Sequence, residues 1–125
     1  MMAAPDVIST ADKLALFSDH WNPRIVGKYN GNELRLAKVQ GDFTWHSHAE
    51  TDELFFVLHG ELGLEFRDGV RQVKAGEMIV VPRGVEHRPF AEQEVHMLVV
   101  DREGEPNTGI TRPSARARSW RRSDG

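Results

Sequence analysis

Residues 41 to 53 read GDFTWHSHAETDE, and they place two histidines, His46 and His48, one residue apart. In an extended strand, residues i and i+2 project to the same face, so both imidazoles can reach one point. Glu53 closes this stretch and His87 comes later, and the segments that hold them read as β-strands. Three imidazoles and a carboxylate in this pattern predict a metal site with four ligands.

The composition is that of a chain with room for one domain. It has 125 residues, 39% of them hydrophobic. Its formal net charge of −3 gives no overall electrostatic attraction to nucleic acid or anionic membranes. There is no cysteine, which excludes disulfides and thiolate ligands, and no apolar run long enough for a membrane span or signal peptide. We therefore expect a cytoplasmic protein with a small-molecule substrate or ligand and with no nucleic acid or membrane partner.

Most of the chain reads as short strands separated by turns that contain glycine. The expected strands are 24–29, 34–39, 43–48, 53–58, 62–66, 72–73, 78–81, 87–90 and 95–100. Closely spaced short strands of this kind indicate an antiparallel barrel or a jelly roll. Ser9 and Asp12 have the spacing of a capping box, which predicts a helix from Ser9 to about Asp19 or His20.

Three of the expected strands contain an uninterrupted apolar run: 54–58, 78–81 and 97–100. A strand with one face in water alternates instead, so the outer faces of these strands need a cover. The N-terminal helix and a second copy of the chain can provide it, and we expect a homodimer. We divide the chain into an N-terminal arm (1–8), a single domain (9–110) and a basic tail (111–125).

Two motifs carry a resemblance to a known family. Residues 41–60 resemble the first motif of the cupins, and residues 76–87, GEMIVVPRGVEH, resemble the second. The stretch from about Ser9 to Gly109 is similar to small single-domain cupins, among them those encoded beside polyketide spore-pigment enzymes. The resemblance implies an all-β fold, the double-stranded β-helix or jelly-roll barrel of cupins. It also implies four metal ligands: His46, His48, Glu53 and His87.

Two positions depart from the cupin motifs. Four residues rather than five separate Gly41 from His46, and Ala91 stands where the general motif has asparagine. Neither departure falls on an implied ligand, so the implied site is retained.

The carboxylate ligand needs its own argument, because strand parity favours other acids. In an uninterrupted strand, Glu50 and Asp52 would lie on the same face as His48, and Glu53 would lie on the opposite face. Residues 49–52 are polar, however, and lie between two apolar strands, so we interpret them as a turn after which parity restarts. Glu53 then opens the next strand facing inward, as the spacing in cupins implies, with Glu50 and Asp52 in solvent.

Among the remaining polar residues, His96 is the candidate catalytic group. It begins the last expected strand and could point into the barrel toward a metal or substrate, or it could be a packing residue. His20 and His59 are predicted at the surface. Arg35 and Lys38 could face an acidic substrate, and an outward, solvated position is equally consistent with the sequence.

The predicted site suits one divalent transition metal ion, namely Fe, Mn, Ni, Zn or Cu. Four protein ligands in an octahedral arrangement leave two positions open, which favours catalysis over a purely structural role. The sequence therefore predicts a metal-dependent small-molecule enzyme, a dioxygenase or an isomerase or cyclase. The alternative is a non-catalytic cupin that binds a metal or small ligand. Because imidazole binds metal when neutral and titrates near ~6.5, the ion should leave as the pH falls through roughly 6 to 5.

Overall fold

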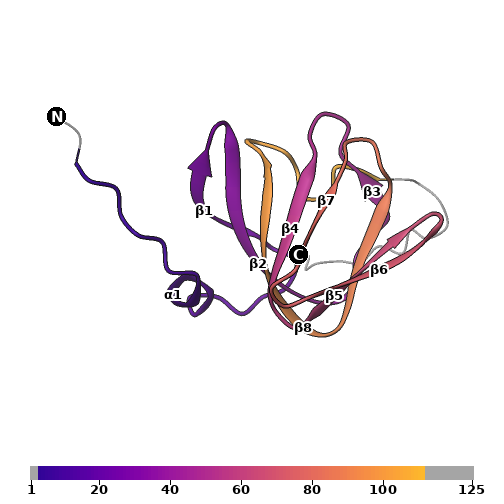
Figure 1. The fold of residues 1–125 in the computed structure, drawn as a ribbon, viewed down its shortest axis with the longest axis horizontal. Coiled ribbons are helices and arrows are strands. Elements are labelled where there is room, and N and C mark those ends of the chain that lie inside the picture. Colours follow the sequence, from indigo (N-terminus) through magenta and orange to yellow (C-terminus); the bar gives the residue numbers. More distant parts are fainter. Residues whose placement is uncertain (1–2, 112–125) are drawn as a thin grey trace.

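The computed structural model describes residues 3–111, in which one short helix precedes a set of antiparallel strands (Figure 1). The helix is α1 (Thr10–Leu14). The strands are β1 (Arg24–Tyr29), β2 (Asn32–Asp42), β3 (His46–Ser47), β4 (Glu53–His59), β5 (Glu61–Phe66), β6 (Gly69–Lys74), β7 (Met78–Val81), β8 (His87–Arg102) and β9 (Ile110–Thr111). No helix in this part of the chain is long and apolar enough to cross a membrane. The predicted all-β class is confirmed.

The longest strand, β8, joins the two halves of the jelly roll. Its first half pairs with β5 and with the end of β2, and its second half lies between β2 and β4. The sequence predicts two strands here, 87–90 and 95–100, because the polar residues 92–94 interrupt the apolar pattern. They are instead one continuous strand of 16 residues, since hydrogen bonds to its neighbours continue on both sides of the interruption.

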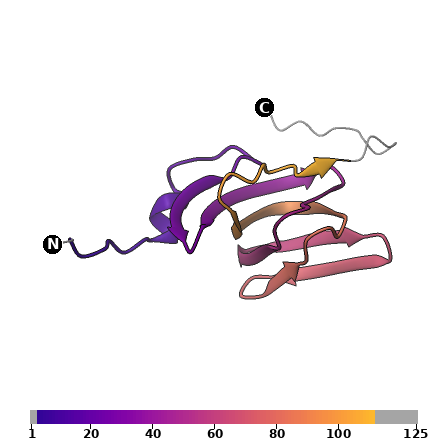
Figure 2. The same ribbon diagram turned by 90° about the horizontal axis from the view of Figure 1, so that it is seen from above.

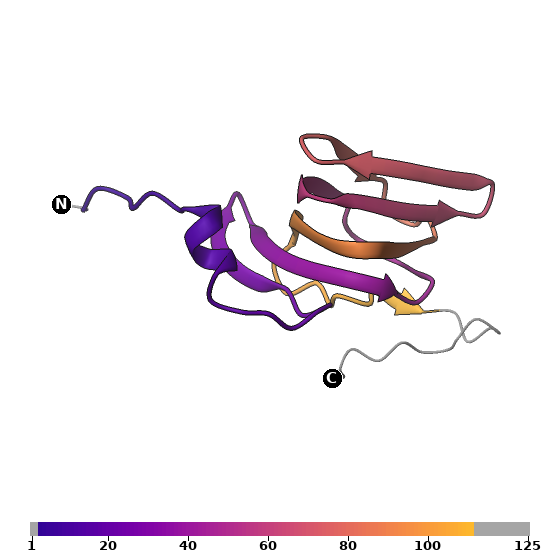
Figure 3. The ribbon, with the colours of Figure 1, turned by 90° about the horizontal axis from the view of Figure 1, so that it is seen from below.

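The helix begins where the sequence predicts and ends earlier. The Ser9 side chain accepts a hydrogen bond of 3.1 Å from the backbone N–H three residues on, which is the expected N-terminal cap. The helix ends at Leu14 rather than near residues 19–20, because the segment that follows is drawn onto β2. There the Trp21 N–H donates to the Lys38 carbonyl at 2.9 Å. The arm before α1 points away from the strands (Figures 2 and 3).

The core fills the space that the strands enclose. Buried positions alternate along β4 and β8 with the period of two expected for strands. Trp21 joins this core from the segment before β1, and its ring stacks on Phe43 at a centroid distance of 4.7 Å. The backbone of Trp21 lies in the left-handed region at φ +60°, which is uncommon for a bulky residue. Burial of the indole and its hydrogen bond to the Gln40 carbonyl (2.9 Å) hold this conformation.

An outer apolar face covers β4, β7 and the second half of β8. Its residues are cross-strand neighbours: Leu54, Phe56, Met78, Val80, Leu98 and Val100. Met78 and Val80 are 59% and 53% exposed, respectively. Helix α1 packs chiefly on β2, so the cover that the sequence predicts from the helix lies over a different strand.

Candidate metal centre

The four side chains that the sequence predicts as metal ligands lie together in the interior. His46 belongs to β3 and pairs across the sheet with His87, the first residue of β8. His48 follows β3, and Glu53 opens β4. Each residue offers one nitrogen or oxygen atom, and these atoms lie within 4.8 Å of one another. All four residues are buried, so the structure keeps a compact group of donor atoms away from bulk water.

Of the three nearby acidic residues, Glu53 faces this group. Its Oε1 lies 3.2 Å from His87 Nε2 and 3.3 Å from His48 Nε2. Glu50 is exposed, and the Asp52 carboxylate turns outward to accept a hydrogen bond of 2.9 Å from a backbone N–H. The segment between the two strands is not extended, so parity restarts after it, as the sequence argument requires.

A hydrogen bond at Nδ1 orients each imidazole. Nδ1 of His46 lies 2.9 Å from the backbone carbonyl two residues earlier, and His87 repeats this arrangement at the same distance. Nδ1 of His48 lies 3.0 Å from Glu105 Oε2. A proton on each Nδ1 leaves Nε2 as the donor atom for a metal, and a carboxylate partner makes the ring a stronger ligand.

The donor set fits a divalent transition ion. His48 Nε2 is buried and lies 3.3 Å from Glu53 Oε1 without a well-aligned hydrogen bond to it, an arrangement that suits a metal ligand. Imidazole and carboxylate donors suit Fe, Mn, Ni, Zn or Cu. An ion held by His46, His48, Glu53 and His87 would therefore satisfy an atom that the protein alone leaves unsatisfied.

The electrostatics of the ion-free site place a proton where an ion would bind. Burial, reinforced by the nearby His87, lowers the pKa of His46 to about 3, so this ring is neutral. Burial also opposes charge on His48, but the Glu53 and Glu105 carboxylates outweigh it and raise its pKa to about 9. For Glu53, burial is outweighed by the partners His48 and His87, and its pKa is lowered. At neutral pH the site therefore contains a buried His48–Glu53 ion pair, and a metal ion must displace its proton.

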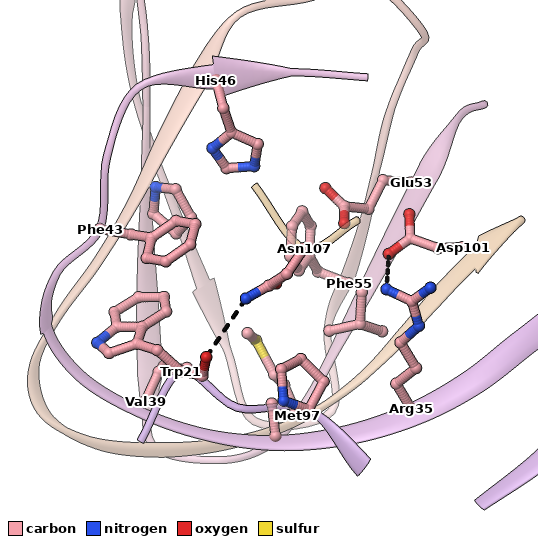
Figure 4. A pocket seen from close by; sticks show the side chains of 14 residues that line it. Trp21, Arg35, Val39, Phe43, His46, Glu53, Phe55, Met97, Asp101 and Asn107 are labelled. Atoms are coloured by element: carbon pink, nitrogen blue, oxygen red, sulfur yellow. Dashed lines mark hydrogen bonds and ion pairs between the residues drawn. The ribbon is translucent and has the colours of Figure 1, made fainter. Parts of the chain in front are cut away.

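A pocket borders the centre (Figure 4). His46 and Glu53 line it on one side, and Trp21, Phe43 and Met97 contribute aromatic and apolar walls. Its volume is about 30 Å³, room for little more than a water molecule. The arrangement brings two of the four donor residues to the edge of a mostly apolar space.

Three polar residues near the ligands were not identified as part of the site from sequence: Asp101, Glu105 and Asn107, the last of which lines the pocket and donates to the Trp21 carbonyl at 3.3 Å. Asp101 lines the pocket beside Glu53. Burial, together with the charge of Glu53, raises the pKa of Asp101 to about 8. A signal for Asp101 does exist in the sequence, because it continues the alternation of Val95, Met97 and Val99 on the inner side of β8. Glu105 and Asn107 lie in the loop after β8, where no periodicity predicts direction.

His96 lies away from the centre. Its neighbours Val95 and Met97 are buried in the core, so alternation directs His96 to the outer side of β8. There its Nε2 lies 3.1 Å from Glu94 Oε1, and its ring is 4.9 Å from that of His59. The prediction that His96 points into the barrel is therefore wrong. Met97 lines the pocket instead.

The two basic residues of β2 point in opposite directions. Arg35 is buried and lines the pocket, whereas the Lys38 ammonium donates to the Phe17 carbonyl at 2.7 Å on the outer side. The sequence left both orientations open for each residue. Of the two, Arg35 is the one that borders the candidate site.

Gly109→Ala is expected to weaken metal binding by about tenfold or more, the scale of damage to groups that orient a ligand. A Cβ at Gly109 would clash with the Ser47 carbonyl oxygen and lie 2.7 Å from His48 Nδ1. It would therefore displace the ring or its hydrogen bond to Glu105. Competition with a chromogenic chelator measures the ion affinity.

Gly104→Ala is the matched control. Gly104 also has a positive φ, at +82°, but a Cβ there would meet no atom within 4 Å. This variant carries similar backbone strain without the clash, so its ion affinity should stay at the wild-type value. Equal affinities for the Gly104 and Gly109 variants would show that the loop does not control His48.

Comparison with known proteins gives the family. A family model described as a cupin domain matches residues 33–101. The crystal structure of a cupin-2 domain containing protein from Shewanella frigidimarina NCIMB 400 is 44% identical, with a TM-score of 0.77, over 78% of this chain and 95% of that one. A protein from Neisseria meningitidis is 31% identical, with a TM-score of 0.72, over 78% of this chain and 100% of that one.

Two further matches are shorter or more distant. YdbB of Bacillus subtilis (strain 168), described as an uncharacterized protein, is 41% identical over 64 residues, which are 50% of this chain and 57% of that protein. The structure of hydroquinone 1,2-dioxygenase from Sphingomonas sp. TTNP3 with 4-hydroxybenzoate bound has a TM-score of 0.64 at 20% identity, over 82% of this chain and 80% of that one. At this identity the match shows only that the two proteins share a fold. Since the family model spans more than half of the sequence, the chain belongs to the cupin domain family.

Proposed function

We propose that this cupin is a metal-dependent enzyme that acts on a small molecule, as a dioxygenase or as an isomerase or cyclase. The observation that carries the proposal is a buried group of three imidazoles and one carboxylate at the edge of an apolar pocket. A purely structural ion needs no adjoining pocket, whereas a catalytic ion needs space for substrate beside it. The dioxygenase that shares the fold supports the same direction.

The residues of the chain would divide the work between them. A bound ion would supply Lewis-acid or redox chemistry to a substrate oxygen. His46, His48, Glu53 and His87 would hold it. The rings of Trp21 and Phe43 would exclude water and contact a flat apolar substrate. Asp101, whose pKa is raised to about 8, keeps a proton beside Glu53 at neutral pH.

A second candidate function is a non-catalytic module that binds a metal or a small ligand. The pocket volume of about 30 Å³ favours it, because a catechol or diketone needs more space than the structure provides. For the enzyme, the pocket must widen when substrate enters. The two functions therefore differ in whether a bulky ligand reaches the ion at all.

Turnover separates the two functions. Metal-free protein is loaded under anaerobic conditions with Fe(II), Mn(II), Ni(II) or Zn(II). It is then mixed with catechols, hydroquinones and diketones. After oxygen is admitted, oxygen consumption and product formation are measured. The enzyme predicts turnover with at least one ion and none in the ion-free protein. His96→Asn is the control, since His96 faces outward and its loss should leave turnover intact. Tight ligand binding without product for any ion would favour the binding module.

We also propose that two copies of the chain associate through the outer apolar face. Exposed apolar patches of this kind on sheets mark interaction sites, and a second identical face is a suitable cover. Light scattering at micromolar concentration should give a mass near twice 14.1 kDa. Met78→Glu or Val80→Glu should yield the monomer.

Val70→Glu is the control for the dimer. Val70 is 46% exposed but belongs to β6, outside the outer apolar face. The same charge at this position should leave the mass unchanged. A monomeric wild-type protein, or dissociation by all three substitutions alike, would argue against the face.

A further inference from the structure

A cluster of buried ionisable side chains lies directly behind the candidate metal centre. Arg35 is 6% exposed and Asp101 is 1% exposed, and Glu33 is buried beside them. Burying charged groups costs more free energy than their pairing reliably returns, and replacement by apolar residues is often neutral or stabilising. Stability alone therefore does not account for this cluster.

The Arg35 guanidinium is the centre of the cluster. Its Nη2 donates to Glu33 Oε1 at 2.7 Å and to the Glu105 backbone carbonyl at 2.8 Å. Its Nη1 donates to Asp101 Oδ2 at 3.3 Å, a contact drawn in Figure 4. Three groups from β2, from the end of β8 and from the following loop are thus held by one planar side chain.

Two of these partners lead to metal ligands. The Asp101 carboxyl lies beside Glu53 on the wall of the pocket. The Glu105 side chain lies 3.0 Å from His48 Nδ1, while the backbone of the same residue is held by Arg35. The paths Arg35–Asp101–Glu53 and Arg35–Glu105–His48 therefore end on two different ligands.

We propose that Arg35 is a positioning residue that sets the orientation of Glu53 and His48 together, through Asp101 and Glu105. The inference rests on the proposed metal centre. Groups behind the ligands fix ligand direction and commonly control metal affinity by about 10- to 100-fold. Glu33 in turn orients Arg35, because its carboxylate accepts hydrogen bonds from both Nε and Nη2 and so fixes the plane of the guanidinium.

Lysine is the informative replacement at position 35. It keeps the positive charge for Glu33 and Asp101, but a single ammonium lacks the planar fork that reaches three acceptors in different directions. Arg35→Lys should bind Co(II) about 10- to 100-fold more weakly than wild type in chelator competition. At saturating Co(II), its visible absorption spectrum should also differ, because the ligand directions change.

Arg24→Lys is the matched control. Arg24 is also an ion-paired arginine, with Asp19 at 3.0 Å, and it lies on β1 next to β2. Its hydrogen bonds go to Asp19 and Asn22 and to none of the four ligands, so its Co(II) affinity and spectrum should equal those of wild type. Thermal unfolding of the ion-free variants reports any general loss of stability separately from these two measurements.

A double-mutant cycle tests whether Arg35 acts through Asp101. In an Asp101→Ala background, Arg35→Lys should weaken Co(II) binding by a smaller factor than in wild type, because one path is already broken. Equal factors in the two backgrounds, or a wild-type affinity and spectrum for Arg35→Lys, would overturn the inference while the metal centre stands. Failure of the wild-type protein itself to bind Co(II) would remove the metal centre and this inference with it.

Discussion

His46→Ala and His87→Ala are each expected to purify with little or no bound ion. Each substitution removes one of four donors from a buried group and opens a space at the centre of the interior. The loss of affinity should exceed the roughly 100-fold that follows damage behind the ligands, because a metal–nitrogen bond itself disappears. Elemental analysis after dialysis against a weak chelator measures the ion per chain.

Two other histidines provide the controls for this experiment. His20 is paired with Glu94 at 2.8 Å, and His59 is exposed beside His96. His20→Ala and His59→Ala should retain one ion per chain. An ion retained at full occupancy in His46→Ala or His87→Ala would refute the ligand assignment.

Ion affinity is expected to increase about tenfold per pH unit between pH 7 and pH 9, since one proton must leave for each ion bound. The proton is that of His48, whose pKa the Glu53 and Glu105 carboxylates raise to about 9 against the opposing effect of burial. This window lies above the range of pH 6 to 5 that an ordinary imidazole predicts. Titration calorimetry in two buffers of different ionisation enthalpy at pH 7.5 counts the protons released.

The stability of the ion-free protein should change with pH in the opposite sense. The folded-state pKa of His48 lies above its ordinary value of 6.5, so its pairing contributes fully below that value and is lost as the pH rises through about 9. Asp101, with a pKa raised to about 8, acts in the same direction. Unfolding in denaturant should therefore become easier from pH 6.5 to 9 without the ion. At saturating ion the His48 contribution should not change over this range, because neither the unfolded chain nor the ion-bound form holds the His48 proton. Affinity that is constant over this range would contradict the His48–Glu53 ion pair.

The sequence predicted that His46, His48, Glu53 and His87 would lie together, because local rules determine most of this arrangement. His46 and His48 are two positions apart, and the polar turn that follows resets the parity before Glu53. The same alternation, counted from the buried Val95, would have placed His96 on the outer side and Asp101 on the inner side. The inward orientation of His96 was predicted because this count was not made. Arg35 could not be placed in the same way, because its buried position depends on acceptors distant in sequence.

The fold was predicted less well wherever long-range contacts override local pattern. A run of three polar residues, 92–94, suggests a break between two strands, yet neighbours on both sides keep β8 continuous. The helix was predicted too long because its apolar residues satisfy a helical pattern. In the structure, the hydrogen bond from the Trp21 N–H to the Lys38 carbonyl holds the following segment against β2. The sequence of the helix does not predict that contact.

The continuity of β8 ties the metal centre to the global unfolding of the protein. His87 stands at the first position of this strand and Asp101 near its last, so the ligand and the acid behind Glu53 share one element that pairs with β2, β4 and β5. Opening of either end of β8 would therefore move His87 or Asp101 and weaken the binding of an ion. Amide hydrogen exchange across those strands should therefore slow as a single cooperative unit when the ion binds. An ion bound by these residues would therefore stabilise the whole barrel.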